Sequence, residues 1–480
     1  MQENEILDRL RAIAGAGQVD TEEHLLRAAS VDRFKKYPAA HGIYDGPFPL
    51  AIVRARDTAT VAAVLAFADE HRINVVPRTG RTGTEGGLET SVPGSIVLDG
   101  SEMDAVLEID PVNMQARVQC GVPLRVLEER LREQGLTTGH SPQSKPLAQY
   151  GGLVATRSIG QFSTLYGGIE DMVAGLEAVF PDGTVSRIKS VPRRAAGPDI
   201  RSIVLGNEGA LCFVTEVTVK VFRHQPENNR FHGYLLEDVH TGIAILREVV
   251  TTGSRPSVAR VYSEQDAAQH FAHFAQGNCV AVFVTGGPKA IAEATSAEID
   301  RIVSGYPHEK TDPALIEEWF DNLNWGPDKI EAEREAMLTE HALGYTTEVS
   351  ADWSTIGRIY DRVLERIRTE FPHARDITLL GGHSSHSYQN GTNMYFVYDY
   401  RIDCDPRAEI EKYHKPINAI IVEETLALGG SMVHHHGIGK YRAEWTEREH
   451  GSAYPMLRRL KEAFDPNGIM NAGTIFPADR

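Results

Sequence analysis

The spacing of apolar residues changes from helical to strand-like within the first hundred residues. Apolar positions in residues 6–13 recur at helical spacing, so we expect residues 1–45 to form a helical lead-in. A short apolar run at 50–53 predicts a strand, and Asp57 stands where it would cap a helix that continues to about His71. The chain therefore opens with helices and then enters an α/β unit.

The α/β unit continues with a strand at 73–77 that runs directly into a glycine-rich loop at 80–87. Pro123 marks the start of a later helix through Gln134, which Gly135 would end. Short apolar or alternating segments predict further strands at 95–99, 105–110, 115–120 and 214–222.

A hairpin is expected between Val173 and Ile188, because Pro181–Gly183 has the composition of a tight turn. After residue 226 the pattern mixes helices with short strands, which indicates another domain. The last residues carry a histidine run and a predicted helix at 454–464. The boundaries that follow from these changes are 1–45, 46–225, 226–425 and 426–480.

Composition narrows the classes of protein that fit this pattern. The 480 residues are too many for one ordinary core, and a formal net charge of −17 argues against a nucleic-acid partner. No apolar stretch approaches the roughly 18 residues of a membrane span, and the acidic start does not resemble an export signal. Four scattered cysteines form no disulfide framework. We expect a cytoplasmic protein without a membrane-spanning segment.

Four glycines in the eight residues from Gly80 to Gly87 form the first candidate binding site. Such a loop points several backbone N–H groups into one space and can hold a pyrophosphate without side chains. Glycine also lets a ligand approach the backbone closely. The spacing is neither the G-x-G-x-x-G dinucleotide motif nor a Walker A loop. Taken alone, the loop is equally compatible with a mobile connection between two strands.

Three later segments, in a fixed order, make the pattern specific. They are a second glycine-rich passage at 151–160, expected to run from a strand into a loop, the segment 166–173, and a third glycine-bearing turn at 206–216. The order P-R-x-x-x-T-G-x-x-G-G, GG-x-VAT, YG-x-IED-x-V and G-x-EG-x-L-x-x-x-TE resembles the flavin domain of the vanillyl-alcohol-oxidase, or PCMH-type, family. The resemblance covers about residues 45–225 and resumes over 375–476.

This resemblance implies an α+β fold, in which a PCMH-type FAD-binding domain of two subdomains (46–225) is joined to an α+β cap, or substrate, domain (226–425). Residues 426–480 would return to the flavin site. Some relatives tether FAD covalently through a His in the first loop, where this chain has Arg, Thr and Glu, so we expect non-covalent FAD, with a tether from another segment as the alternative. The residues that the resemblance assigns to the cofactor are Pro77, Arg78, Thr79, Gly80, Arg81, Thr82, Gly83, Gly87, Pro142, Gly151, Gly152, Thr156, Gly160, Ile169, Ile203, Glu208 and Gly209.

The run of three histidines at His434–His436 is the most unusual segment of the chain. Buried imidazoles need partners, so a solvent-facing cluster and a metal site are both alternatives. Adjacent side chains on an extended chain point in opposite directions, so at most two of the three could bind one ion. A second cluster, with His383, His386 and Tyr395, could supply a further group.

A tyrosine hydroxyl beside imidazoles can lose its proton transiently, and histidine exchanges protons near neutral pH. Such a group over a flavin is suited to accept the proton released in an oxidation. Within the family, Y-x-x-G-x-x-x-Y-F at 388–396 and H-H-H-G-I-G-K at 434–440 resemble alkyldihydroxyacetone-phosphate synthase. By that likeness Tyr395 corresponds to its catalytic tyrosine, and Arg260 to a substrate-binding arginine.

The sequence departs from these relatives at two points, one that concerns the substrate and one that concerns a metal site. His383 stands where the synthase has a second arginine, and an imidazole cannot hold a phosphate or carboxylate in a bidentate way. The metal motifs of the 2-hydroxy-acid dehydrogenases are also broken, because Tyr395 and His435 replace a His and a Glu. We therefore expect no metal site of that kind.

These observations favour an FAD-dependent oxidoreductase that oxidises a small alcohol or 2-hydroxy acid by hydride transfer to the flavin. A Tyr or His would accept the proton, and Arg260 would bind an anionic group of the substrate. The alternatives are a synthase-like transferase without net redox change and a flavin-binding protein without catalysis. The assembly state, including a homodimer, stays open. The candidate catalytic residues are Tyr395, His434, His435, His436, Arg260, His383 and His386.

Overall fold

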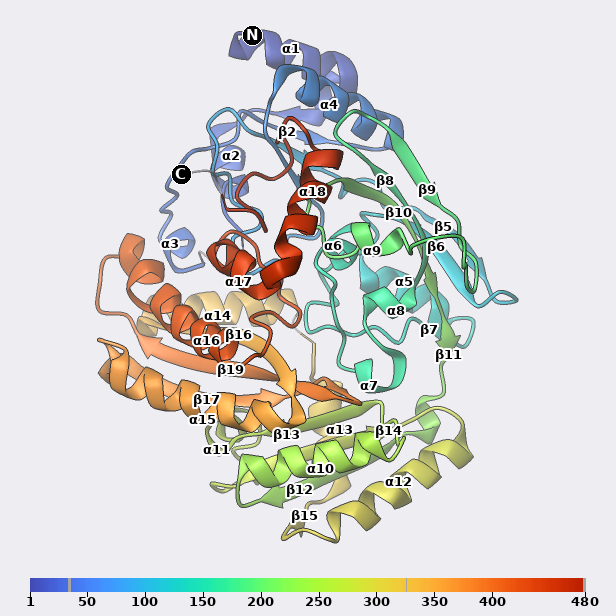
Figure 1. The fold of residues 1–480 in the computed structure, drawn as a ribbon, viewed down its shortest axis with the longest axis vertical. Helices are drawn as coiled ribbons and strands as arrows, with labels where there is room; N and C mark the ends of the chain where they lie inside the picture. The colour runs from blue at the N-terminus through green and yellow to red at the C-terminus, as the bar shows by residue number, and fades with distance from the viewer. Residues whose placement is uncertain (33–35, 325, 478–480) are drawn as a thin grey trace.

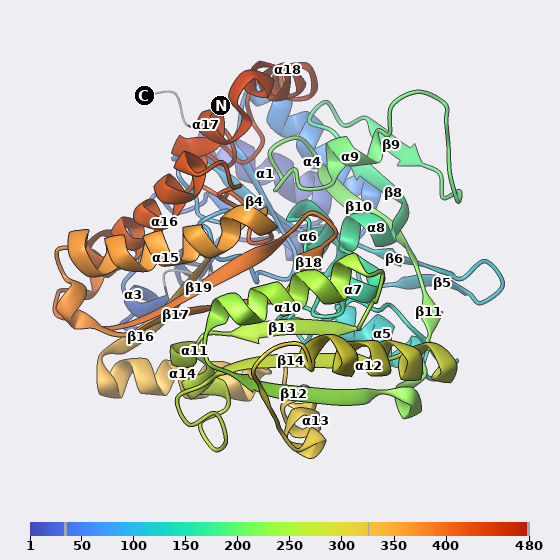
Figure 2. The same ribbon diagram turned by 60° about the horizontal axis from the view of Figure 1, so that its bottom comes forward.

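The computed structural model describes residues 1–32, 36–324 and 326–477 (Figures 1 and 2). The lead-in is helical, as expected, except for a short strand that joins the first sheet. Its elements are α1 (Glu3–Ala14), β1 (Val19–Asp20), α2 (Glu23–Ala29) and α3 (Lys36–Ala40). The first sheet has the order β1-β2-β4-β3, in which all pairs but β1–β2 are parallel. Its other strands are β2 (Ala51–Arg54), β3 (Val75–Arg78) and β4 (Ile96–Asp99).

Parallel strands need a crossover, and α4 (Thr58–His71) provides it between β2 and β3. The helix begins where the sequence predicts, because the Asp57 side chain accepts a hydrogen bond from the Thr60 amide. Val61, Val64 and Leu65 of this helix are fully buried against the sheet.

The second sheet is antiparallel and has the order β5-β6-β10-β8-β9. The predicted hairpin is confirmed, since β8 and β9 pair on either side of a turn in which Gly183 has a positive φ. Its strands are β5 (Val106–Asp110), β6 (Gln115–Gln119), β8 (Val173–Val179), β9 (Val185–Ile188) and β10 (Phe213–Lys220). Nearby elements are α5 (Leu124–Arg132), β7 (Leu136–Thr137), α7 (Ser163–Tyr166), α8 (Ile169–Met172), α9 (Arg201–Val204) and β11 (Phe222–Arg223).

The strand predicted at the start of the 151–160 passage is wrong, because this stretch forms the helix α6 (Tyr150–Ala155). The buried residues Tyr150, Leu153 and Val154 are spaced i, i+3 and i+4, which is the spacing of one helix face. The glycines let this helix approach its neighbours, since a Cβ at Gly151 would lie 2.9 Å from the Cβ of Cys120. Close packing therefore outweighed the low helix propensity of two adjacent glycines.

The third sheet has eight strands, in the order β15-β12-β14-β13-β17-β19-β16 with β18 paired to β19. Alternation divides its residues between two faces. Val261, Phe396 and Val349 pack under a layer of helices, whereas the polar residues between them face the first two sheets. The strands are β12 (Arg230–Leu236), β13 (Val258–Tyr262), β14 (Cys279–Thr285), β15 (Glu309–Lys310), β16 (Ala342–Asp352), β17 (Ile377–Ser384), β18 (Ser387–Tyr388) and β19 (Gly391–Arg401).

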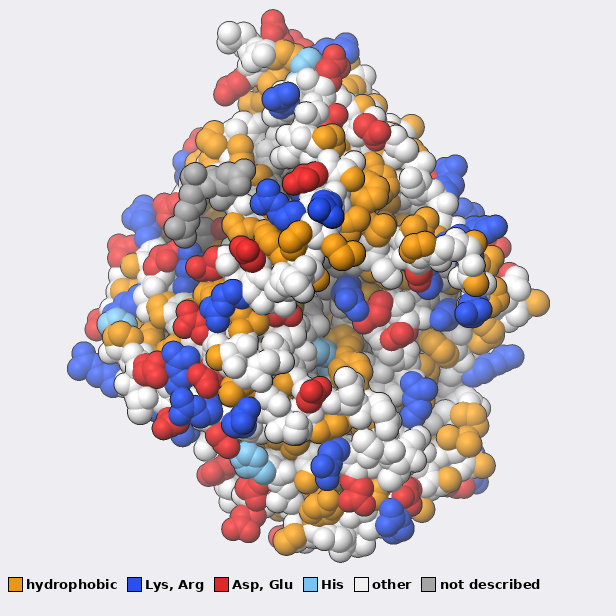
Figure 3. Space-filling model, viewed as in Figure 1, with side chains coloured by type: hydrophobic (Ala, Val, Ile, Leu, Met, Phe, Trp, Pro, Cys, Tyr) orange, Lys and Arg blue, Asp and Glu red, His pale blue; other side chains and the backbone are white. Residues whose placement is uncertain are grey.

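Helices cover the large sheet, and Figure 2 shows α10, α15 and α16 above its strands. The helices of this region are α10 (Val239–Thr251), α11 (Glu264–His270), α12 (Lys289–Val303), α13 (Pro313–Asp321), α14 (Pro327–Glu340), α15 (Trp353–Glu370) and α16 (Lys415–Ala427). In the part of the chain that the structure describes, no helix is both long and apolar enough to cross a bilayer. Figure 3 shows acidic and basic side chains intermixed over one face of the molecule.

The C-terminal segment returns to the first sheet, and in Figure 1 its red ribbon lies among elements drawn in blue and green. Val75 of β3 donates a hydrogen bond to the Ile469 carbonyl, and the Asn471 amide donates to the Val75 carbonyl. The segment contains α17 (Thr446–His450) and α18 (Tyr454–Phe464), and α18 matches the predicted helix. The histidine run thereby lies between the large sheet and the first sheet.

Candidate active site

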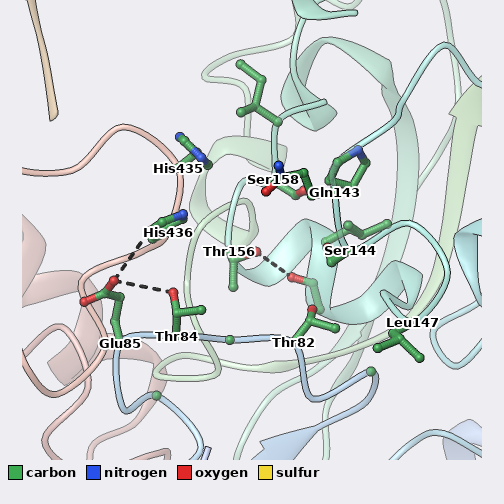
Figure 4. Close-up of a pocket in the computed structure, with 18 of the residues that line it drawn as sticks. Thr82, Thr84, Glu85, Gln143, Ser144, Leu147, Thr156, Ser158, His435 and His436 are labelled. Carbon is green, nitrogen blue, oxygen red and sulfur yellow. Dashed lines mark hydrogen bonds and ion pairs between the residues drawn. The ribbon is translucent and has the colours of Figure 1, made fainter. Parts of the chain in front are cut away.

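A cavity of about 600 Å³ lies between the loops of the first two sheets and the polar face of the large sheet. One wall is the loop after β3, and a second is the segment 142–161 around α6. The large sheet forms the opposite wall. His435 and His436 also line the cavity, and Figure 4 shows them around the same pocket as Thr156 and Ser158. Segments far apart in sequence therefore build one site.

A row of polar side chains crosses four strands of the large sheet. Strand pairing places Tyr262 beside His383, His383 beside Tyr395, and Tyr395 beside Glu348. Directly paired residues point to the same face of a sheet. The His383 and Tyr395 rings stack with their centroids 4.7 Å apart, and the His435 ring follows 5.8 Å beyond Tyr395.

Arg260 is a buried cation on the same wall. It lies two residues before Tyr262 on β13, and its guanidinium stands over the Tyr262 and Trp319 rings. Its Nη1 donates to the Tyr262 hydroxyl, while its Nε lacks a hydrogen-bond partner among the described residues. A buried guanidinium with an unused donor beside a cavity is suited to an anionic ligand group.

Glu348 on β16 determines the conformation of the histidine run. Its carboxylate accepts backbone hydrogen bonds from His434 (3.2 Å), His435 (3.1 Å) and His436. Three consecutive amides cannot point at one group in an extended strand, so the run is a loop wrapped around this carboxylate. Burial alone would raise the pKa of Glu348, but Arg442 and the His436 and His435 imidazoles hold it well below its usual value.

Arg442 joins the histidine loop to the loop after β3. Its side chain is 0 % exposed and lies between two buried carboxylates, 3.3 Å from Glu348 and 3.2 Å from Glu85. Glu208 holds the next residues of the loop by accepting the amides of Ile438 and Gly439. The resemblance assigns Glu208 to the cofactor, and it does line the cavity, but both of its carboxylate oxygens bind the loop. Burial raises its pKa to about 7, against the lowering effect of those two amides.

Asp266 on α11 orients the His383 imidazole. The two are joined by a 2.6 Å hydrogen bond to Nδ1, and His270 lies 3.4 Å from the other carboxylate oxygen. Burial alone would raise the pKa of Asp266, yet the His383 and His270 imidazoles hold it well below its usual value. Burial lowers the pKa of His383, against the opposite effect of Asp266. At neutral pH the imidazole is therefore neutral, with its N–H on Nδ1 toward the carboxylate and its lone pair on Nε2, which forms no hydrogen bond within the described residues.

The Tyr395 hydroxyl has a different character. It accepts a hydrogen bond from Thr346 at 3.0 Å, and burial raises its pKa to about 12. At neutral pH the hydroxyl therefore keeps its proton and can donate it to an oxygen atom in the cavity. Tyr395 and His383 together offer a donor and an acceptor side by side.

The structure brings the two predicted histidine clusters together. The nitrogen atoms of His386, His434 and His435 lie within 4.8 Å of one another, and so do those of His435 and His436 with a Glu348 oxygen. Either group could hold a divalent cation by spacing alone. The predicted absence of a metal site stays a prediction.

The cavity walls fit the cofactor that the resemblance implies. Gln149 and Gln161 line the cavity, and their side-chain amides include buried atoms without a partner in the described chain. Such atoms need a polar ligand, as the isoalloxazine and ribityl groups of FAD are. The residues assigned to FAD line the cavity, with three exceptions. Gly160, Ile169 and Ile203 pack behind the wall instead.

Of the candidate catalytic residues, only His434 does not line the cavity. Sequence analysis missed Glu348, Arg442, Asp266 and Glu85, whose hydrogen bonds to His383, to the histidine run and to one another span more than 80 residues of the chain. Glu348 falls among the polar positions of the alternation at 343–349, together with Gly344 and Thr346, so the local pattern gave no sign that it is buried.

We predict that Gly80→Ala weakens FAD binding at least tenfold. A Cβ there would lie 2.8 Å from both the Gln149 amide nitrogen and the Leu147 carbonyl oxygen, so the loop would have to leave the start of α6. The measurement is the Kd for FAD by fluorescence quenching. Gly17→Ala, whose Cβ meets nothing within 4 Å, is the control. Normal FAD affinity in Gly80→Ala would show that this loop does not shape the cofactor site.

Two family models match the chain. The FAD binding domain matches residues 49–189, and the C-terminal domain of FAD linked oxidases matches residues 225–475. The uncharacterized FAD-linked oxidoreductase YgcU of Escherichia coli is 63 % identical over 99 % of both chains. The alkyldihydroxyacetonephosphate synthase of Caenorhabditis elegans is 26 % identical over 99 % of this chain and 82 % of its own. The glycolate oxidase subunit GlcD of Bacillus subtilis is 25 % identical over 96 % of this chain and 97 % of its own.

Solved structures confirm the predicted α+β fold of the PCMH type. An alkyldihydroxyacetonephosphate synthase superimposes with a TM-score of 0.79 and 21 % identity, covering 100 % of this chain and 86 % of the other. p-Cresol methylhydroxylase superimposes with a TM-score of 0.76 and 16 % identity, covering 99 % of this chain and 97 % of the other.

Proposed function

The chain belongs to the FAD linked oxidases, and from this premise we propose that it oxidises a small alcohol or 2-hydroxy acid. It is an FAD-dependent oxidoreductase, and bound FAD supplies the acceptor for a hydride. The observation that carries the proposal is the side-by-side arrangement of Tyr395 and the carboxylate-bound His383 on the cavity wall. One group donates a hydrogen bond and the other accepts a proton, as oxidation of a C–OH group requires.

Arg260 sets the proposed substrate class. Its unused Nε–H and positive charge would bind a carboxylate or phosphate, at the same wall as Tyr395. A 2-hydroxy acid places its hydroxyl next to its carboxylate, which suits this short separation. The name of the GlcD relative points the same way, because glycolate is a 2-hydroxy acid.

The proton acceptor in this proposal is Nε2 of His383, with the Tyr395 hydroxyl bound to the same substrate oxygen. As the substrate C–H hydrogen leaves with its electron pair for FAD, the O–H bond breaks and its proton moves to Nε2. The remaining electron pair on oxygen forms the C=O bond. Asp266 is a positioning residue, because it holds the imidazole with the lone pair toward the cavity.

A synthase-like transfer without net redox change is the second candidate. The relation to alkyldihydroxyacetonephosphate synthases, together with Tyr395 and the histidine run, favours it. Against it, His383 is engaged by Asp266 and offers no bidentate grip for a phosphate.

Several narrower predictions accompany this proposal. We propose that residues 46–225 bind FAD, that 226–425 supply the substrate wall, and that 426–480 close the site. The family matches at 49–189 and 225–475 support this division. We also propose that FAD is bound without a covalent link, because the loop at 80–87 contains no histidine.

Anaerobic mixing tests the function directly. We expect small 2-hydroxy acids or alcohols to bleach the visible absorbance of the bound flavin. Tyr395→Phe should lower the bleaching rate about 100-fold while the protein stays yellow, since a hydrogen bond that stabilises the reacting oxygen is lost. Exchange of an acyl chain for an alcohol on an acyl-dihydroxyacetone phosphate, without bleaching by any hydroxy acid, would favour the transferase instead.

A further inference from the structure

A chain of hydrogen-bonding groups runs from the cavity wall toward the outside of the molecule. Nδ1 of His435 lies 2.8 Å from Nδ1 of His434, and Nε2 of His434 lies 2.7 Å from the Tyr388 hydroxyl. His435 lines the cavity, whereas His434 and Tyr388 lie behind its wall. Tyr388 is 40 % exposed at the surface. These three side chains therefore connect the cavity with a residue that is partly exposed to solvent, through two short hydrogen bonds.

The protonation states suit transfer along this chain. Burial lowers the pKa of His434 to about 4 and that of His435 well below its usual value, and the neighbouring imidazoles add to the effect on His435. Burial also raises the pKa of Tyr388. At neutral pH each imidazole therefore carries one N–H and one lone pair, and the tyrosine carries O–H. Each group can receive a proton on one side while it releases another on the opposite side.

The 2.8 Å separation of the two Nδ1 atoms is a hydrogen-bond distance, with one nitrogen donating and the other accepting. Two imidazole ligands at ~2.05 Å from a tetrahedral ion would be about 3.3 Å apart. The pair is thus arranged for hydrogen bonding to each other, and a bound cation would require the rings to separate. His386 stacks on His434 at 5.2 Å, but its own hydrogen bond goes to Ser163, so it lies beside the chain.

We propose that His435, His434 and Tyr388 form a proton path that carries the proton released in substrate oxidation from the cavity to solvent. This inference rests on the proposed function. The Tyr395 ring lies between the rings of His383 and His435, but no hydrogen bond joins the three in the described part of the chain, so the proton would pass from His383 to His435 through the cavity that all three line. The histidine run, which the redox step itself does not explain, thereby acquires a role.

The transfer balances without an additional reactant. A proton arriving at Nε2 of His435 forms an N–H bond there, while the Nδ1–H bond breaks and its proton moves to Nδ1 of His434. The Nε2–H proton of His434 then moves to the Tyr388 oxygen, which releases its own proton to water. One positive charge crosses the chain, no electrons move along it, and each imidazole ends the transfer in its other tautomer.

The test follows flavin bleaching and proton release in the same anaerobic stopped-flow experiment, in weak buffer with a pH-indicator dye. For the unmodified holoenzyme we expect the two rates to be equal. Tyr388→Phe removes one hydroxyl from a partly exposed side chain, and we expect proton release to become at least tenfold slower than bleaching. Ser163→Ala is the matched control, because it removes the hydrogen bond to His386 beside the chain. Its two rates should stay equal.

A second variant tests the middle of the path. His434→Gly should show the same delay, and added imidazole should restore rapid proton release, which a purely structural defect would not allow. Proton release that keeps pace with bleaching in Tyr388→Phe would overturn the path but leave the proposed function intact. Stoichiometric divalent metal in the purified protein would also overturn it. Absence of bleaching with every hydroxy acid and alcohol would overturn the path together with the proposed function.

Discussion

Arg442→Met is expected to destabilise the protein by about 3–5 kcal/mol at neutral pH, the usual cost of breaking a buried ion pair. Arg442 is fully buried between Glu85 and Glu348, so its removal leaves two carboxylates without their cation. Methionine fills much of the space but supplies no charge. Chemical denaturation of the FAD-free and FAD-bound forms measures the change in the free energy of unfolding.

The pH dependence distinguishes this cause from a packing defect. The pKa of Glu348 is held below its usual value in the folded protein, so its ionised form adds stability that is present above the unfolded pKa of ~4.3. That stability is lost as the pH falls toward the folded pKa. The Arg442→Met protein lacks most of this stabilisation by ionised Glu348 at every pH. The difference between the two proteins should therefore be largest near pH 7 and shrink below about pH 4.

Arg375→Met is the control, because this side chain is 89 % exposed and its ion pair with Asp376 spans 3.9 Å. We expect its free energy of unfolding to change by less than about 0.5 kcal/mol. An Arg442→Met protein as stable as this control would show that the carboxylates do not need the guanidinium. A difference that is independent of pH would assign the effect to packing.

Asp266→Asn is expected to lower the rate of substrate oxidation by about 10²- to 10⁴-fold, the range for loss of a positioned proton acceptor. The amide can donate to Nδ1 of His383, which moves the imidazole proton to Nε2, the atom that faces the cavity. His383 then has no lone pair for the substrate proton. The measurements are the single-turnover bleaching rate and its pH profile.

The pH dependence of the bleaching rate has a direction that follows from the pKa of His383. In the unmodified protein the bleaching rate should rise with pH through the lowered pKa of His383 and then level, because the neutral imidazole is the active form. Asp266 opposes that lowering, so its replacement should move any remaining acid limb to lower pH. Retention of the normal rate in Asp266→Asn would exclude His383 as the acceptor.

Asp361→Asn provides a matched control for this substitution. Asp361 also binds an imidazole, His240, at 3.0 Å, but both side chains are about half exposed and lie outside the cavity. The two variants make the same chemical change to a carboxylate–imidazole pair. Only the buried pair should affect the bleaching rate, and FAD content should be unchanged in both.

Much of the fold was predictable because local patterns specify it. The helix after Asp57, the hairpin around Gly183 and the helix at 454–464 form where capping, turn composition and apolar spacing indicate them. The order of the glycine-bearing motifs identified the FAD family, since each motif is short and depends on backbone conformation. The passage at 151–160 was mispredicted because α6 forms through packing that its glycines permit.

The sequence by itself therefore determined the family, the cofactor and the residue types available for catalysis. Only the tertiary structure decided how these residues are used. Strand pairing sets His383 between Tyr262 and Tyr395, and the Glu348 carboxylate bends the histidine run into a loop. The physical reason is that buried charges must find partners, and those partners come from distant segments whose proximity no local pattern records.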